Sequence, residues 1–448
     1  MRKIKPWVWI LIAMVVALIV GGIINKTCVV SDKGADLEFN QTGTTLVSIF
    51  DYIGTLFMNL LKMVIVPLVF SSIVVGIAGL GKTDGFARLG VKTVAYYAMT
   101  SLIAILIGLT LVNLIQPGLV DGKPNEAIKS QIESKEAEYS GKVSAKIGDT
   151  SKDMGAVRDL FLRMVPQNVF EAFGANNKML SLIFVALLTG IGMIFIGGSG
   201  RGALLGFFEG VNELAMLITN WVMFLAPIGV FGLVAETVSQ TGFPIIQLLA
   251  KYFGVVLAAL LIHLLVVMPL ILFFIAKVNP WRHFWAMRNA LLTAFSTSSS
   301  SATLPITMRA LREKAGASKR VTSFVLPLGA TVNMDGTALY ECVAVMFVAQ
   351  VLGFDMSFGV QFTVVTLALL TSIGVAGVPS ASLVAITIIV YNVGIPGAEA
   401  VIGLLLAVDR PLDMTRTAVN VFSDSCGGIV IAKSEGEDVL SIKRNEAP

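Results

Sequence analysis

Two polar stretches inside an otherwise apolar chain decide the fold: Ser296-Thr297-Ser298-Ser299-Ser300-Ser301-Ala302-Thr303-Leu304-Pro305 and Ser372-Ile373-Gly374-Val375-Ala376-Gly377-Val378-Pro379-Ser380-Ala381-Ser382. Each lies between two apolar arms that are shorter than the about 20 residues a helix needs to cross a bilayer. Backbone that leaves the helix at membrane depth has to be buried in protein. We therefore predict two re-entrant hairpins with buried tips. A simple low-complexity serine loop is the alternative for the first stretch.

The two stretches also begin a repeated pattern. Asp335 follows Ser299 by 36 positions, and Asp413 follows Val378 by 35, so a hairpin and a polar span occur twice. Basic residues flank only the first hairpin: Arg288, Arg309, Arg312 and Lys314. Because the second hairpin has no such flank, we expect the two to enter from opposite sides, as in an inverted repeat. Transporters built this way bind substrate at the repeat interface, where helix N-termini offer backbone N–H groups to anions.

The composition places the rest of the chain in a membrane. Of 448 residues, 55% are hydrophobic and 14% charged, against about 25% charged in soluble domains. The apolar runs lack the alternation of apolar and polar residues that a β-barrel would show. The net charge of +4 comes from Lys and Arg at span ends rather than from one basic patch, so no nucleic-acid partner is implied. Three cysteines, Cys28, Cys342 and Cys426, show no metal-ligand or disulfide spacing. His263 and His283 are expected to be structural, with a proton relay as the alternative, because neither lies beside a carboxylate in sequence.

The expected fold is an all-α polytopic membrane protein with eight transmembrane helices. The first six spans are placed at 7–25, 45–80, 90–116, 179–198, 205–237 and 244–276. Basic residues follow spans two, four and six, so those ends and both termini are expected in the cytoplasm. The polar segment 117–178 is then an extracellular loop. The opening run to about residue 24 has no small-residue cleavage site, so we interpret it as an uncleaved first span.

The last span carries the chemistry. Five polar residues lie at offsets 0, 3, 4, 7 and 11 and share one helix face: Asp413, Arg416, Thr417, Asn420 and Asp424. Each charge at the membrane centre costs roughly 2.5–3.5 kcal/mol on insertion scales, so these groups need partners or ligands. An internal Asp413–Arg416 ion pair that only holds helices together is the alternative. The preceding span contains Gly329-Ala330-Thr331-Val332-Asn333-Met334-Asp335-Gly336-Thr337, which predicts an unwound segment. Oxygen ligands of this kind suit a hard cation rather than a transition metal.

Together the serine-rich tip, the Asn333–Thr337 run, the Gly377-Val378-Pro379 tip and the Asp413–Asp424 face resemble the glutamate transporter family, the dicarboxylate/amino acid:cation symporters that include the excitatory amino acid transporters. The resemblance covers nearly the whole chain. It implies a homotrimer in the cell (inner) membrane that works as an elevator, with scaffold segments 1–89 and 179–240, transport segments 90–116 and 241–432, and a cytoplasmic tail at 433–448. The substrate is implied to be glutamate or aspartate, the coupling cation sodium, and no organic cofactor is expected.

By that resemblance the substrate is held by Ser299, Ser300, Thr337, Val378, Ser382, Asp413, Arg416, Thr417 and Asn420. Arg416 takes the side-chain carboxylate and Asp413 the ammonium. Three cation sites are implied: Asp424 and Asn420 with the carbonyls of Gly329 and Asn333; main-chain oxygens near Thr331, Ser372, Ile373 and Val375; and Asp335 and Asn333 with Tyr97, Thr100 and Ser101. Glu341, one turn beyond Thr337, is hypothesised to carry a proton; a plain buried, protonated glutamate is the alternative.

Rival functions differ in the residues they need. A C4-dicarboxylate symporter keeps the arginine but usually lacks the aspartate that stands here as Asp413, and neutral amino-acid relatives replace Arg416. An intramembrane aspartyl protease on Asp335 and Asp413 would need a Gly-x-Gly-Asp run, which is not present, and an ion channel would pass current without solute flux. Relatives carry an arginine at the position of Ser298 or of Met414, and neither is present here.

Overall fold

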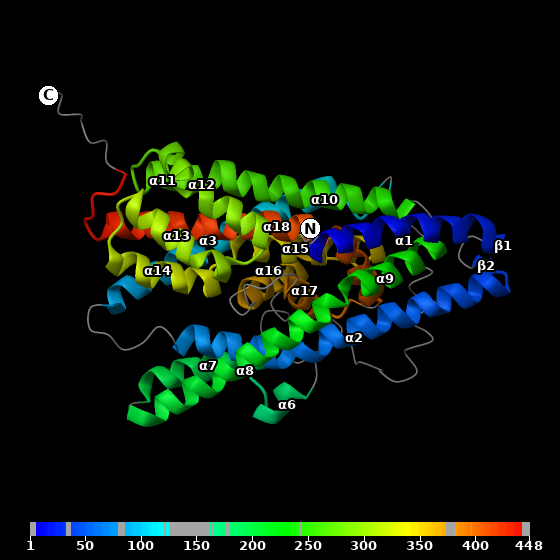
Figure 1. The fold of residues 1–448 in the computed structure, drawn as a ribbon, viewed down its shortest axis with the longest axis horizontal. Coiled ribbons are helices and arrows are strands. Elements are labelled where there is room, and N and C mark those ends of the chain that lie inside the picture. Colours follow the sequence, from blue (N-terminus) through cyan, green and yellow to red (C-terminus); the bar gives the residue numbers. More distant parts are fainter. Residues whose placement is uncertain are drawn as a thin grey trace, which may run out of the picture.

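The computed structural model describes residues 6–32, 37–78, 86–120, 122–124, 162, 165–174, 179–196, 198–241, 244–372, 381–395 and 397–440. Within these ranges the chain is almost entirely helical (Figure 1). The elements are α1 (Pro6–Cys28), β1 (Val29–Asp32), β2 (Leu37–Phe39), α2 (Gln41–Ala78), α3 (Phe86–Ile115), α6 (Val169–Phe173), α7 (Met179–Phe195), α8 (Gly198–Phe224), α9 (Ala226–Thr241), α10 (Pro244–Ile262), η3 (His263–Val267), α11 (Met268–Phe274), α12 (Pro280–Thr297), α13 (Ser300–Glu313), α14 (Lys319–Val332), α15 (Asp335–Leu352), α16 (Phe358–Ser372), α17 (Ala381–Val393) and α18 (Ala398–Ser434).

The expected spans agree with these helices in most places. The run 205–237 is instead divided between α8 and α9 at Leu225. Pro227, the second residue of α9, has no backbone N–H with which to continue the helical ladder. The short antiparallel pair β1–β2 is a local exception to the expected all-α fold. Its ends are fastened by Asn40, whose N–H donates to the carbonyl of Cys28 at 2.8 Å.

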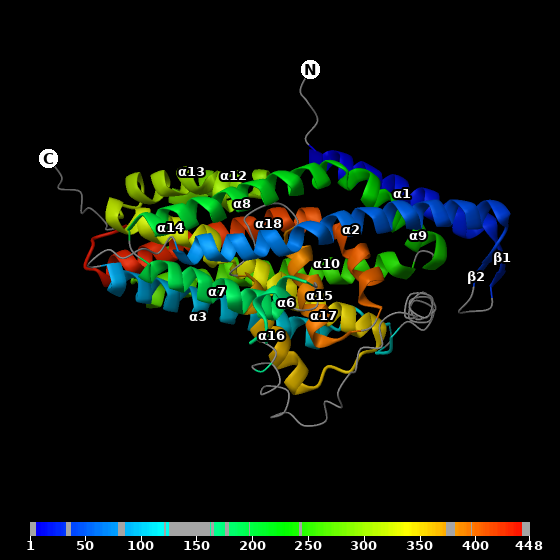
Figure 2. The ribbon, with the colours of Figure 1, turned by 90° about the horizontal axis from the view of Figure 1, so that it is seen from below.

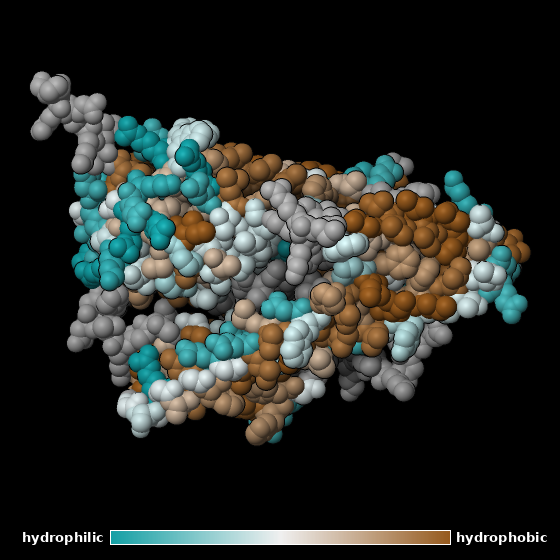
Figure 3. Space-filling view, in the orientation of Figure 1, coloured by the Kyte–Doolittle hydropathy of each residue, from teal (hydrophilic) through white to brown (hydrophobic). Residues whose placement is uncertain are grey.

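Four stretches in the described part of the chain are long and apolar enough to cross a membrane: Arg88–Ile115, Gly198–Val222, Gln247–Phe274 and Lys319–Leu352. Large apolar side chains lie exposed on the outer helices, among them Phe207, Trp221, Phe273 and Phe274. In Figure 3 apolar residues cover much of the face over α1, α9 and α10, whereas hydrophilic residues gather at the left end, over α13 and α14. This pattern fits a multi-pass membrane protein; the count of eight spans remains a prediction.

The first serine stretch forms a helical hairpin. Helix α12 ends at Thr297, and Ser298 takes a left-handed conformation (φ 51°, ψ 37°) that reverses the chain. Ser299 then caps α13 by accepting a hydrogen bond from the N–H of Ala302 at 3.2 Å. The serines are therefore a tight tip between two packed helices rather than a loose loop. The second pair, α16 and α17, also packs together, but its predicted tip, with Ile373, Val375 and Val378, lies outside the described residues.

Two sets of helices pack among themselves. Helix α2 contacts α7, α8 and α9, and α9 also contacts α1. In the other set α18 contacts α12, α13, α14, α15 and α17, and α3 contacts α15. Figure 2 shows α18 between α12–α13 on one side and α15–α17 on the other. Contacts also run between the sets, since α9 touches α18 and α2 touches α14, and the division into scaffold and transport segments stays a prediction.

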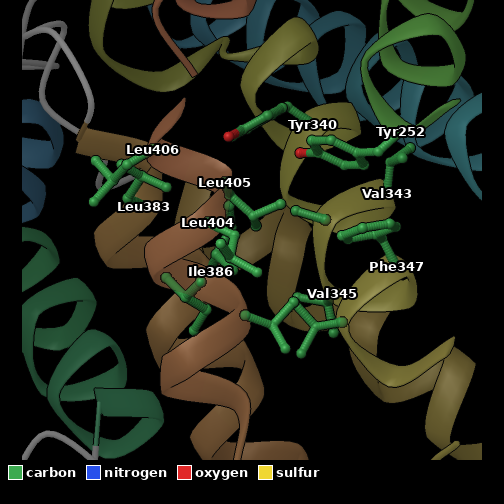
Figure 4. Close-up of a cluster of buried hydrophobic side chains, with 14 of the residues drawn as sticks. Tyr252, Tyr340, Val343, Val345, Phe347, Leu383, Ile386, Leu404, Leu405 and Leu406 are labelled. Atoms are coloured by element: carbon green, nitrogen blue, oxygen red, sulfur yellow. The ribbon is translucent and has the colours of Figure 1, made fainter. Parts of the chain in front are cut away.

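Helix α15 forms the centre of the second set. It is buried on all sides, as expected of a helix with no polar stripe along its length. Figure 4 shows its residues Tyr340, Val343 and Phe347 facing Tyr252 of α10, with leucines of α17 and α18 closing the other side. The rings of Tyr252 and Phe347 lie 4.7 Å apart. This packing fixes where the first residue of α15, Asp335, can lie.

Contacts at one end of the molecule join segments that the sequence places on the cytoplasmic side. Arg201 Nη2 donates to the carbonyl of Ala78 at 3.0 Å, which ties α8 to α2. Lys92 Nζ lies 2.5 Å from Glu435 Oε1, and this contact holds down the pKa of the partly buried Glu435 carboxyl. Glu437 accepts a 2.8 Å hydrogen bond from the N–H of Ser318, the cap of α14. The first residues of the predicted tail, up to 440, are thus docked on the bundle.

Candidate substrate and cation sites

The predicted break in the seventh span is present. Asn333 (φ −98°, ψ 84°) and Met334 (φ −111°, ψ 54°) leave the helical conformation between α14 and α15. Asn333 and Asp335 have no exposed surface, and Met334 is 2% exposed. A polar break buried this deeply needs hydrogen-bond partners for its side chains and free carbonyls. Those partners come from α3, η3 and α18.

The first group of partners surrounds Asp424 of α18. Asn333 Nδ2 donates to Asp424 Oδ1 at 2.9 Å and to Ser423 Oγ at 3.0 Å. Gly329, one turn before Asn333, faces the same carboxylate so closely that a Cβ there would overlap it. The structure therefore brings together Gly329, Asn333 and Asp424, as the first predicted cation site requires.

Asn420, the remaining member of that predicted site, turns toward the start of α15. Its Oδ1 accepts from the N–H of Gly336 at 2.7 Å, and its Nδ2 donates to Thr337 Oγ1 at 3.1 Å. Gly336 lies against the backbone of Arg416, where a Cβ would come within 2.9 Å of the Arg416 carbonyl oxygen. Asn420 thus holds the broken helix against α18, between the cation cluster and the charged part of α18.

The second group surrounds Asp335. Ser101 Oγ donates to its Oδ1 at 2.6 Å, and Thr100 Oγ1 lies 3.3 Å from the same oxygen. Thr100 Oγ1 also lies 3.4 Å from Asn333 Oδ1. Tyr97, expected here, instead donates its hydroxyl to the carbonyl of Val325 at 2.7 Å and lies close to Gly329. Among the described residues, hydroxyl, amide and carboxylate oxygens therefore surround Asp335, and such a donor set suits a hard cation.

Two partners of Asp335 were not expected. Ser423 Oγ donates to Asp335 Oδ2 at 2.5 Å, and His263 Nε2 lies 3.1 Å from the same oxygen. Sequence reasoning assigned His263 a structural role because no carboxylate is near it in the chain. The proximity arises between α10–η3 and α15, which are 72 positions apart at these residues, and no local pattern could have shown it.

A chain of four charges runs along α18. Arg416 Nη2 lies 2.7 Å from Asp413 Oδ1, and its Nη1 lies 3.2 Å from Asp409 Oδ1. Arg410 Nη1 lies 3.2 Å from Asp413 Oδ2. The guanidinium of Arg416 also stacks 4.5 Å above the ring of Tyr340. The two acidic and two basic side chains balance in charge. The Asp413–Arg416 ion pair, considered above as an alternative to a binding role, does form. Asp409 and Arg410 were missed, although they lie four and three residues before Asp413 on the same helix face.

The hairpin residues supply further polar groups. Ser300 and Ser382 are 3% and 1% exposed. The buried hydroxyls of Ser298 and Ser382 have no hydrogen-bond partner in the described part of the protein. Thr417 donates its hydroxyl back to the carbonyl of Asp413 at 2.7 Å. Both hairpins pack on α18, so polar groups from three elements gather along it.

Glu341 and the second predicted cation site lie toward α16. Glu341 is fully buried, and its Oε2 accepts from Thr371 Oγ1 at 2.6 Å. Its Oε1 has no hydrogen-bond partner among the residues that the structure describes. The hydroxyls of Thr331 and Ser372 donate to carbonyls of their own helices, and no described hydrogen bond joins them. The arrangement of that site stays a prediction, because Ile373 and Val375 fall outside the described residues.

Comparison with known proteins gives a consistent family. The model of the "Sodium:dicarboxylate symporter family" matches residues 7–434. The chain is 37% identical over 403 residues to the "Proton/sodium-glutamate symport protein" of Bacillus subtilis (strain 168), covering 88% of this chain and 90% of that protein. It is 34% identical over 439 residues to the "Proton/glutamate-aspartate symporter" of Escherichia coli (strain K12), covering 97% and 94%. It is 33% identical over 461 residues to human "Excitatory amino acid transporter 3", covering 95% and 85%. These proteins are transporters, not enzymes, and this chain belongs to the sodium:dicarboxylate symporter family.

Proposed function

We propose that the chain is a secondary active symporter of acidic amino acids, glutamate or aspartate, driven by sodium. The observation that carries this proposal is the buried pair of Asp413 and Arg416 on one helix face, 2.7 Å apart and 2% exposed each. An acidic amino acid offers an ammonium for Asp413 and a side-chain carboxylate for the planar guanidinium of Arg416, which binds carboxylates bidentately. The substrate then replaces the contacts that the two residues make with each other.

The cost of burying these charges supports a role in binding. A buried ion pair gives little net stability, and hydrophobic residues of similar volume often serve as well. Four charges on one buried stretch of α18 are therefore expensive as mere structure. Asp409 pairs with Arg416, and Arg410 pairs with Asp413, so the four charges balance one another along α18.

Sodium coupling is supported by the two oxygen clusters. Asp424 with Asn333 and Gly329 would hold one ion, and Asp335 with Thr100 and Ser101 another. Each site offers hydroxyl, amide, carbonyl or carboxylate oxygens, the ligands that hard cations prefer. A substrate of net charge −1 entering the cell works against about 2.3 kcal/mol per 100 mV, so at least two positive charges have to accompany it for the potential to assist uptake.

Proton coupling is assigned to Glu341. The carboxyl is buried away from water and is bonded to Thr371 on the first arm of the second hairpin. Burial favours its neutral form, and release of the proton would change this contact with α16. The plain structural reading, in which Glu341 stays protonated throughout, predicts no effect on the pH dependence of uptake.

The remaining features of the mechanism extend the proposal. We place the protein in the cell (inner) membrane as a homotrimer, with both termini cytoplasmic. Segments 90–116 and 241–432 move as an elevator against scaffold segments 1–89 and 179–240, and 117–178 lies outside the cell. The contacts that join Ala78 to Arg201 and Lys92 to Glu435 at one end support a shared side for those segment ends.

Uptake of radiolabelled aspartate into proteoliposomes, with sodium, proton and potassium gradients imposed separately, tests the function. We expect uptake that requires an inward sodium gradient and that unlabelled glutamate or aspartate inhibits. A C4-dicarboxylate symporter would instead be inhibited by succinate as strongly as by aspartate. That result, or uptake that does not depend on sodium, would overturn the proposal.

A further inference from the structure

His263 is the one described histidine that contacts an acidic side chain in the core. Its Nε2 lies 3.1 Å from Asp335 Oδ2, and neither side chain has exposed surface. Its Nδ1 has no hydrogen-bond partner within the described residues. The ring is therefore attached to the protein through one polar contact, and that contact is with a candidate cation ligand.

The helix widens at this residue. Residues His263–Val267 form a π-helical turn, in which the N–H of Met268 bonds to the carbonyl of His263, five residues earlier. A π turn inserts an extra residue into an α-helix and occurs frequently at functional sites. In this chain it begins at the residue whose ring reaches Asp335, so the irregularity and the contact coincide.

The four partners of Asp335 divide its carboxylate into two sides. Oδ1 faces the hydroxyls of Thr100 and Ser101, and Oδ2 faces His263 and Ser423. Hydroxyl groups can rotate their hydrogen away and present a lone pair to a cation. An imidazole N–H cannot do so, because its nitrogen has no free lone pair. The side with Thr100 and Ser101 can therefore receive a cation. On the other side Ser423 Oγ already accepts a hydrogen bond from Asn333 Nδ2 at 3.0 Å, and the His263 N–H can only hold the carboxylate in place.

We propose that His263 is a positioning residue for this cation site: its Nε2–H fixes the rotation of the Asp335 carboxylate so that Oδ1 points at the cation. The inference rests on the proposed sodium coupling. A group that orients a metal ligand from behind typically changes metal affinity by about 10- to 100-fold when it is lost. The effect falls on sodium rather than on the amino acid, because the polar contact of the His263 ring is with Asp335, a proposed cation ligand.

Three variants test the role. In His263→Gln the amide nitrogen can reach Asp335 as a donor, whereas His263→Leu keeps the volume and removes the donor. His283→Leu is the control, because His283 is equally buried but contacts Ser425 Oγ at 2.9 Å instead of a carboxylate. Two quantities are measured for each purified protein: the sodium concentration for half-maximal aspartate uptake, and the sodium concentration for half-maximal thermal stabilisation in detergent without aspartate.

We expect His263→Leu to raise both sodium concentrations about 10-fold or more, and His263→Gln to stay within about threefold of wild type. His283→Leu should lower the melting temperature without changing either sodium response. The proposal is overturned if His263→Leu responds to sodium as wild type does, or if His263→Gln is folded and as impaired as His263→Leu. If the wild-type protein itself shows no sodium response, the proposed function fails, and the positioning role fails with it.

Discussion

Replacing Gly329 by alanine should weaken sodium binding at the Asp424 cluster. A Cβ at this position would lie 2.6 Å from the Tyr97 hydroxyl and even closer to Asp424 Oδ1. The carboxylate cannot move away freely, because Asn333 Nδ2 holds it at 2.9 Å. Either the carboxylate turns away from the carbonyl of Gly329 or α14 moves away from α18, and both changes spoil the cation geometry.

The size of the effect follows from two opposing terms. Overpacking a buried site costs about 1–3 kcal/mol. Alanine gains about 0.5–1 kcal/mol over glycine inside a helix, because it loses less backbone entropy on folding. At the middle of both ranges the net cost is about 1.25 kcal/mol, and where the sodium-bound geometry carries this strain it corresponds to roughly an eightfold rise in the sodium concentration needed for half-maximal binding.

The assay is sodium-dependent aspartate uptake in proteoliposomes, compared with sodium-dependent thermal stabilisation of the purified protein. Gly254→Ala is the matched control, since Gly254 is also helical but a Cβ there meets nothing within 4 Å. We expect that control to be unchanged or slightly more stable. If Gly329→Ala binds sodium with wild-type affinity, then Gly329 and Asp424 do not form a cation site.

Three further predictions concern charged groups. Arg416→Cys should abolish uptake of acidic amino acids and lower the melting temperature, since breaking a buried ion pair costs about 3–5 kcal/mol. Adding Asp409→Asn to this variant should recover part of the stability but none of the uptake, and recovered uptake would contradict the binding role of Arg416. Glu341→Gln keeps an acceptor for the Thr371 hydroxyl and cannot titrate, so uptake should lose its pH dependence; an unchanged pH profile would show that Glu341 carries no transported proton. The pKa of Glu435 is lowered chiefly by its hydrogen bond from Lys92, so the ionised carboxyl stabilises the docked tail above the usual glutamate pKa and loses this effect as the pH falls through the lowered value. The hydrogen-exchange protection of residues 435–440, measured relative to the intrinsic exchange rate at each pH, should therefore fall in acid, and in Glu435→Gln it should be low at every pH.

The sequence was most informative where a polar residue interrupts an apolar run. The serine tip and the break at Asn333–Met334 are both present, as predicted. They were predictable because polar residues inside a long apolar helix are costly in a membrane and usually mark a functional site. The face of α18 was also predictable, since helical periodicity places Asp413, Arg416 and Asn420 together whatever the tertiary fold. The same rule includes Asp409 and Arg410, which a longer window would have found.

Contacts between distant helices were not predictable from the chain alone. Ser423 donates to Asp335, 88 positions away, and the N–H of Ser318 donates to Glu437, 119 positions away. Such pairs depend on how the helices are rotated against each other. The periodicity of the sequence predicts which residues share a helix face, but it does not predict which other helix that face contacts. Tyr97 shows the same limit, since it lies beside Gly329 but directs its hydroxyl to Val325.

The proposed substrate and cation sites are joined by the same short segment, and this arrangement bears on the proposed coupling. Asn333 bonds to Asp424 and lies within reach of Thr100, which also faces Asp335, so both cation clusters contact one residue of the break. Three residues later Gly336 donates to Asn420 and packs on the backbone of Arg416. A cation that draws Asn333 toward itself therefore pulls on the same backbone that fixes Arg416. Because Asn333 and Met334 leave the helical conformation, and the N–H of Gly336 bonds to Asn420 instead of to a backbone carbonyl, this segment can change shape without unfolding either helix. Occupancy of the proposed cation clusters can therefore alter substrate affinity over a few residues.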